Sequence, residues 1–140
     1  MLFEISIAIP ANTAAAAPTT VVLKIAHGII SKFMVRPRPG HAGLAHCVIR
    51  HHEHQIAPST EGMTLHGDSH AIDWEEYYEV YQPPYELKIQ GWNEDDTYEH
   101  TFDIFVAILP RKGIIATAVS DALSSVLSFL SPKRIFTGGG

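Results

Sequence analysis

Histidine is the most concentrated chemically active residue in this chain of 140 residues, with nine copies. Three of them lie in the second half of the run Cys47-Val-Ile-Arg-His-His-Glu-His54, and His46 directly precedes this run. Side chains two residues apart share one face of a strand, so a strand here would place His52 and His54 together. A pair of imidazoles on one strand is a known way to hold zinc, iron or manganese. His52 and His54 are therefore the candidate metal ligands of the sequence.

The surrounding residues argue against a metal site. The cupin family of β-barrels uses such a histidine pair followed a few residues later by Glu, but here the next glutamate, Glu61, lies beyond a turn. A third histidine ligand would have to be His66, His70 or His100, and none has the expected Pro-x-Gly setting. We predict no metal and no cofactor, and interpret the cluster as a solvated, histidine-rich edge or loop. Two alternatives stay open: a cupin-like metal-binding protein, and histidines that titrate near pH 6 and tune subunit contacts.

Other catalytic patterns are missing from the sequence. Cys47 stands between apolar neighbours in a strand-like run, which is typical of a buried small hydrophobe rather than a nucleophile. There is no glycine-rich phosphate loop and no Gly-x-Ser-x-Gly elbow. The acidic turn 93–96 could offer oxygen ligands to calcium, but acidic surface turns usually serve solubility. The sequence therefore predicts a protein that is not an enzyme.

Large aromatic residues are concentrated in one quarter of the chain. They are Trp74, Tyr77, Tyr78, Tyr81, Tyr85, Trp92 and Tyr98. Tyr and Trp are enriched in the cores of β-sandwiches and in subunit interfaces, which is the interpretation we favour. An exposed platform that stacks on sugar rings is the alternative, and it would make the chain a carbohydrate-binding or adhesion module.

Alternating apolar residues and turn signals predict the elements that position these groups. The expected strands are 3–9, 21–26, 29–35, 44–55, 71–81 (one strand or a pair), 85–91 and 98–109. Short strands separated by Gly and Pro turns are typical of an all-β, antiparallel sandwich, with a jelly roll as the first choice of topology. The sandwich domain is expected over residues 1–110.

The pattern changes in residues 111–140. From Ile115 onward apolar residues follow helical spacing, and Ser131-Pro132 ends the helix before an extended tail. The predicted interface residues of this amphipathic helix and tail are Ile115, Val119, Leu123, Val126, Leu127, Leu130, Ile135 and Phe136. This apolar face would fold back on the sandwich, pack on another subunit, or lie on a membrane surface with basic residues at both ends.

Composition limits the partners and the compartment. A net charge of −5, with scattered Lys and Arg, argues against direct binding of nucleic acid. The N-terminus has no basic region before its apolar residues, so we expect no signal peptide and synthesis in the cytoplasm. No apolar run reaches the length of a membrane-spanning helix.

Three stretches resemble the single jelly-roll structural proteins of viruses. They are Ile25-Ala26-His27-Gly28-Ile29-Ile30, Pro39-Gly40-His41-Ala42-Gly43-Leu44 and Tyr85-Glu86-Leu87-Lys88-Ile89-Gln90-Gly91-Trp92-Asn93-Glu94-Asp95-Asp96. The likeness is one of architecture over residues 1–110, and it assigns no functional residue. It implies a capsid or other virion subunit that assembles with copies of itself and with other structural proteins. In that case the protein is made in the host cytoplasm and resides in the virion.

Overall fold

A computed structural model describes residues 1–110 and 123–125 of the chain. Residues 1–110 form eight strands. Their bounds are β1 Leu2–Ile9, β2 Thr19–Lys24, β3 Gly28–Pro37, β4 Ala45–His51, β5 His54–Ala57, β6 Ile72–Val80, β7 Glu86–Asn93 and β8 His100–Leu109.

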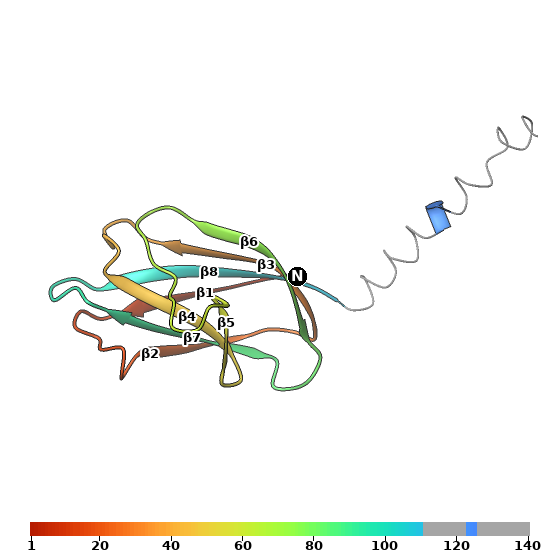
Figure 1. Cartoon of the computed structure of the whole chain (residues 1–140), viewed down its shortest axis with the longest axis horizontal. Coiled ribbons are helices and arrows are strands. Elements are labelled where there is room, and N and C mark those ends of the chain that lie inside the picture. The colour runs from red at the N-terminus through yellow and green to blue at the C-terminus, as the bar shows by residue number, and fades with distance from the viewer. Residues whose placement is uncertain (111–122, 126–140) are drawn as a thin grey trace, which may run out of the picture.

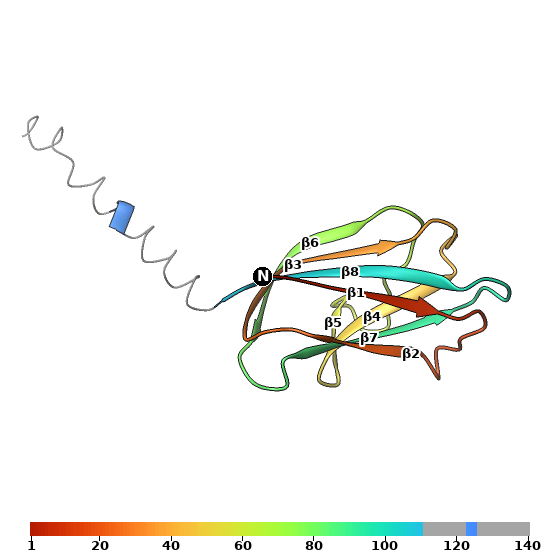
Figure 2. The same cartoon turned by 180° about the vertical axis from the view of Figure 1, so that it is seen from behind.

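The strands build two antiparallel sheets of four that pack face to face (Figures 1 and 2). One sheet has the order β1-β8-β3-β6 and the other the order β2-β7-β4-β5. Every connection except the β4–β5 hairpin crosses from one sheet to the other. This arrangement is a jelly roll, and it confirms the predicted all-β sandwich.

The core lies between the sheets and is built from every second residue of each strand. On β8 the fully buried positions are Phe102, Ile104, Val106 and Ile108. The opposing sheet contributes Leu87 and Ile89 of β7 in the same alternating way. The alternating sequence pattern and the two-residue repeat of a strand thus produce one continuous apolar interior.

Glycine at position 91 is required by the packing of this core. A Cβ atom built on Gly91 would collide with the side chain of Ile9 and lie 3.2 Å from the carbonyl oxygen of His46. Ile9 is fully buried, so its side chain has little room to move away.

The prediction of one strand over residues 44–55 is wrong. The chain reverses at His52 and Glu53, so β4 and β5 form a hairpin in which His51 pairs with His54. His52 has a φ of 55°, in the left-handed region that a non-glycine residue adopts mainly in tight turns. The other predicted strands are confirmed, with ends shifted by at most two residues.

Four loops meet at one end of the sandwich and are joined by hydrogen bonds. The amide of Asn12 donates to the carbonyl oxygen of Asp95, and the carboxylate of Asp68 accepts from the amides of Gly40 and Ala42. Buried Asn93 donates from Nδ2 to the carbonyl oxygens of Ile9 and Tyr98. This end is therefore held together by main-chain and side-chain hydrogen bonds between loops far apart in the sequence.

The start of β1 and the end of β8 lie together at the other end of the sandwich, away from these four loops (Figure 1). Residues 123–125, the described part of the predicted C-terminal helix, are helical. The remainder of residues 111–140 lies outside the described residues. Among the residues that the structure describes, no helix is long and apolar enough to cross a lipid bilayer.

Candidate functional site

The two sides of the sandwich differ in how tightly they close. On one side β1 and β2 pack against each other. On the other side, β5 and β6 border two adjoining hollows of about 190 and 210 Å³, which share Ile56 and Ser59. We call these two hollows together the β5–β6 groove.

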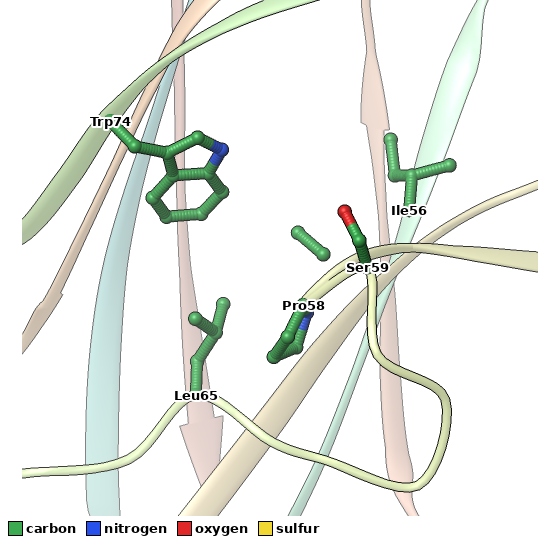
Figure 3. A pocket seen from close by; sticks show the side chains of 6 residues that line it. Ile56, Pro58, Ser59, Leu65 and Trp74 are labelled. Carbon is green, nitrogen blue, oxygen red and sulfur yellow. The ribbon is translucent and has the colours of Figure 1, made fainter.

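The first hollow of the β5–β6 groove is apolar. Figure 3 shows Trp74 facing Pro58, Ser59 and Ile56 across it, and Leu65 completes the lining with Ala57. Leu65 is fixed because its amide and carbonyl exchange hydrogen bonds of 2.9 Å with Cys47. The hollow is therefore lined by residues of both sheets and by a loop residue that is hydrogen-bonded to β4.

Trp74 is held by contacts on its ring and on its edge. Its indole stacks on Phe33 with ring centroids 5.1 Å apart and planes at 26°. Its Nε1 donates a hydrogen bond of 3.2 Å to Glu76, which stands two residues along β6 and lines the second hollow. Residues 74 and 76 thus present an aromatic ring and a carboxylate on the same face of β6.

The second hollow is polar. Besides Glu76, its lining includes His54, Gln55 and Tyr78. The buried amide of Gln55 donates to the carbonyl oxygens of Pro58 and Met63, which holds the β5–β6 loop in place. Its polar side chains include a carboxylate, an imidazole and a hydroxyl, so the hollow suits a cationic or hydrogen-bonding group.

Tyr78 also joins the two sheets through His51. A hydrogen bond of 2.8 Å connects the Tyr78 hydroxyl and Nδ1 of His51. Burial raises the pKa of Tyr78 and lowers the pKa of His51, and neighbouring His52 lowers the pKa of His51 further. Both groups are therefore uncharged at neutral pH.

Six of the nine histidines form three ring pairs. The pairs are His41 with His100, His46 with His66 and His51 with His52, with ring centroids 4.7, 5.3 and 4.1 Å apart. In each pair one ring has a buried nitrogen without a hydrogen-bond partner among the described residues: His41 Nδ1, His46 Nε2 and His51 Nε2. Burial lowers the pKa of His41 and of His51, whereas Nε2 of His46 lies 3.5 Å from the carboxylate of Glu94.

The candidate metal ligands His52 and His54 do not share a strand face. His52 lies in the hairpin turn and His54 on β5, and both side chains are exposed. Among residues 1–110 and 123–125, no group of three or more His, Cys, Asp or Glu side chains is arranged to hold a metal ion. Cys47 is fully buried, as predicted, and burial raises the pKa of its thiol well above the usual range.

The aromatic residues do not form one platform. Trp74 and Tyr78 border the β5–β6 groove, whereas Trp92 stacks on His46 on the outer face of the other sheet. Tyr98 is 68% exposed in the β7–β8 loop. Aromatic residues that are close in the sequence are therefore spread over different surfaces of the sandwich.

The outer face of β8 carries a buried carboxylate, Asp103, that the sequence patterns did not predict. Asp103 is 3% exposed and accepts two hydrogen bonds from Arg38, one from Arg36 and one from Ser6. The Arg38 bonds, aided by Ser6 and Arg36, hold the pKa of Asp103 well below its usual range. The two-residue spacing of Arg36, on β3, and Arg38, which directly follows β3, was the available signal for an anion beside them.

One predicted interface residue, Leu123, is among the described residues. It is helical and 57% exposed. The others lie outside the described residues: Ile115, Val119, Val126, Leu127, Leu130, Ile135 and Phe136.

Comparison with known proteins places the fold. No family model and no curated protein sequence matches the chain. Among solved structures, a chain of the cyanophage Pam1 capsid asymmetric unit matches with a TM-score of 0.51 and 10% identity, over 76% of this chain and 81% of that chain.

Two further structures match less well. The Yersinia pseudotuberculosis-derived mitogen has a TM-score of 0.45, 6% identity and coverage of 78% and 86%. The Penaeus vannamei nodavirus P-domain has a TM-score of 0.33, 6% identity and coverage of 75% and 96%. The strand order and the match to the capsid chain confirm the resemblance to viral jelly-roll proteins at the level of the fold: this chain is a jelly-roll β-sandwich similar to a chain of a phage capsid.

Proposed function

We propose that the protein is a structural subunit of a virion, without enzymatic activity, which assembles with copies of itself. The observation that carries the proposal is the jelly-roll fold of this chain, together with its structural similarity, over most of both lengths, to a chain of a phage capsid. The identity of 10% means that this support comes from architecture rather than from shared residues.

The apolar surface at the end with the chain termini supports the same function. Leu2 and Leu109 are exposed on neighbouring strands there, and residues 111–140 continue from this end with the predicted apolar helix. Exposed apolar side chains that lie close together are typical of interaction surfaces. We propose that this end meets other subunits, with a membrane surface as the alternative partner of the helix.

The test is the mass of the purified full-length chain by light scattering over a range of protein concentration. The expected result is a defined oligomer or particle that is lost when residues 113–140 are deleted, while the far-ultraviolet circular dichroism of the sandwich is retained. A monomer of 15.4 kDa at every concentration would contradict self-assembly. Binding of this monomer to anionic vesicles would then favour the membrane alternative.

A further inference from the structure

We propose that residues 133–136 of one copy, Lys133-Arg134-Ile135-Phe136, bind along β6 of a second copy. In this arrangement Phe136 enters the apolar hollow beside Trp74, and Arg134 pairs with Glu76. The inference rests on the assembly proposed above and names the surface that receives the C-terminal segment.

The two parts of the chain carry opposite charge. Residues 111–140 contain four of the ten Lys and Arg and one of the fifteen Asp and Glu, a net charge of +3. Residues 1–110 hold the other six cations and fourteen anions, a net charge of −8. The C-terminal segment is thus attracted to sandwich surfaces, and complementary charge specifies how such surfaces meet.

The carboxylates of β6 are the best match for the cations of this segment. Four of the nine residues of β6 are acidic and none is basic. Within residues 1–110, one of these carboxylates, Asp73, forms an ion pair, with Lys32 at 3.5 Å. Both side chains of that pair are more than half exposed. Among the described residues Glu76 accepts hydrogen bonds from two neutral donors, Nε1 of Trp74 and the amide of Tyr77. By contrast, Asp95 in the β7–β8 loop is already bound to the titratable ring of His100.

The spacing of the groove matches the spacing of the segment. Trp74 and Glu76 lie on one face of β6, two residues apart, at the apolar and polar hollows respectively. In an extended chain Phe136 and Arg134 also share one face. An antiparallel alignment therefore brings the aromatic ring to Trp74 and the guanidinium to Glu76 together.

The edge of β6 offers the main-chain groups for such an alignment. β6 is the last strand of its sheet and pairs only with β3 among the described strands. An extended peptide can add to an exposed sheet edge through main-chain hydrogen bonds, with side-chain pockets giving specificity. Lys133, on the opposite face of the segment, would then face the exposed row of Glu75 and Glu79.

The exposure of Leu123 favours a second copy as the acceptor. Leu123 belongs to the predicted apolar face of the helix and is 57% exposed, so no described residue of its own sandwich covers it. If another subunit covers this face, the residues that follow the helix are delivered to that subunit.

A charge exchange in the full-length chain tests the pairing. We expect Glu76→Arg and Arg134→Glu, made singly, each to weaken association about tenfold or more because like charges then face each other. Combining the two substitutions restores an attractive pair and is expected to recover most of the wild-type association. Glu99→Arg is the matched control, since Glu99 is an exposed carboxylate in the β7–β8 loop. Light scattering measures association, and circular dichroism checks that each variant is folded.

Crosslinking identifies which copy is bound. Ser59→Cys and Thr137→Cys in one chain, mixed as light and heavy isotope forms, should give disulfides between light and heavy chains by mass spectrometry. The native Cys47 is fully buried and does not compete. Disulfides found only within single chains, or none at all, would overturn the inference.

The outcomes also separate this inference from the proposed function. If the wild type is monomeric, the assembly function itself fails. If the wild type assembles and the charge-exchange variants assemble equally well, assembly stands and only the β6 site is refuted.

Discussion

The indole of Trp74 is stacked on the ring of Phe33, with centroids 5.1 Å apart. Phe33 is fully buried in the core, whereas Trp74 lines the apolar hollow of the β5–β6 groove. One aromatic pair thus connects the interior of the sandwich to its open side. Any occupant of the hollow meets a ring that the core already holds in place.

The fluorescence of Trp74 should therefore show whether the apolar hollow of the β5–β6 groove is occupied. The chain has two tryptophans, so Trp92→Phe leaves Trp74 as the single emitter. We expect its fluorescence to shift to shorter wavelength as the protein concentration rises, because assembly fills the hollow and removes water. The same titration with an added Phe136→Ala substitution should show no shift. An equal shift in both proteins would mean that the hollow is filled by something other than this side chain.

Asp103 should contribute strongly to stability. Asp103→Asn keeps the shape of the side chain but removes the charge that holds Arg36 and Arg38 (2.8–3.0 Å). We expect the free energy of unfolding to fall by about 2 kcal/mol at pH 7, measured by urea denaturation. Asp73→Asn, which alters the exposed pair with Lys32, should change it by less than about 0.5 kcal/mol. Equal effects of the two substitutions would contradict a special role for the buried carboxylate.

The same carboxylate sets the response to strong acid. Its pKa is lower in the folded chain than in the unfolded chain, where it is about 3.9. Its contribution is therefore complete above about pH 5 and is lost as the pH falls through the unfolded pKa toward the folded one, since the unfolded chain binds the proton first. Between pH 4 and pH 2, stability should fall less steeply in Asp103→Asn than in the wild type.

His41 should make the fold sensitive to mild acid. It is fully buried, its Nε2 is 2.8 Å from the carbonyl oxygen of Thr101, and it faces His100, Phe102 and the carboxylate of Asp68. Burial, aided by His100, lowers its pKa in the folded chain, while Thr101 and Asp68 oppose the shift. As the pH falls below about 6.5 the unfolded chain binds a proton that the folded chain does not, so stability decreases.

The measurement is the free energy of unfolding between pH 7.5 and 5. His41→Gln keeps a donor for Thr101 but does not titrate, and should reduce the slope by at most about 1.4 kcal/mol per pH unit. His70→Gln changes an exposed ring and should leave the slope as it is. A slope that is the same in His41→Gln as in the wild type would assign the acid sensitivity elsewhere, with His51 the next candidate.

A side chain at position 91 should destabilise the fold as long as residue 9 is isoleucine. Gly91→Ala forces the new methyl group against Ile9, and overpacking of this kind costs about 1–3 kcal/mol. Ile9→Val removes the methyl group that collides, so the double variant should be more stable than the sum of the single changes implies. Thermal unfolding of the four proteins measures this coupling, and strict additivity would contradict the contact.

The strands could be predicted from the sequence because the alternation of apolar residues is a local pattern. Alternation identifies strands such as β8, where every second residue is apolar and buried. It fails at His52 and Glu53, because the reversal there uses neither Gly nor Pro, and His52 itself adopts the left-handed conformation. The division of 44–55 into β4 and β5 was therefore not visible in the residue types.

The groove and the buried carboxylate were harder to predict because both depend on distant segments. Trp74 and Leu65 meet Ile56 only after β5 and β6 are placed in different sheets. The alternating pattern of β8 predicts an exposed position at Asp103, and its burial arises from Arg36 of the neighbouring β3 and from Arg38, which directly follows that strand. Sequence periodicity contains no information about such cross-strand partners.

The pairing of residue 1 with residue 108 has a consequence for how the chain can be connected. The amino group of Met1 donates to the carbonyl oxygen of Ile108 at 2.6 Å, and the amide of Ile108 donates back to Met1 at 2.7 Å. A short linker from residue 109 to residue 1 would close the chain at little entropic cost, and the exposed loop around Glu61 and Gly62 could supply new termini. The sandwich of residues 1–109 is therefore a natural substrate for circular permutation, in which the same eight strands keep their places while the order of their synthesis changes.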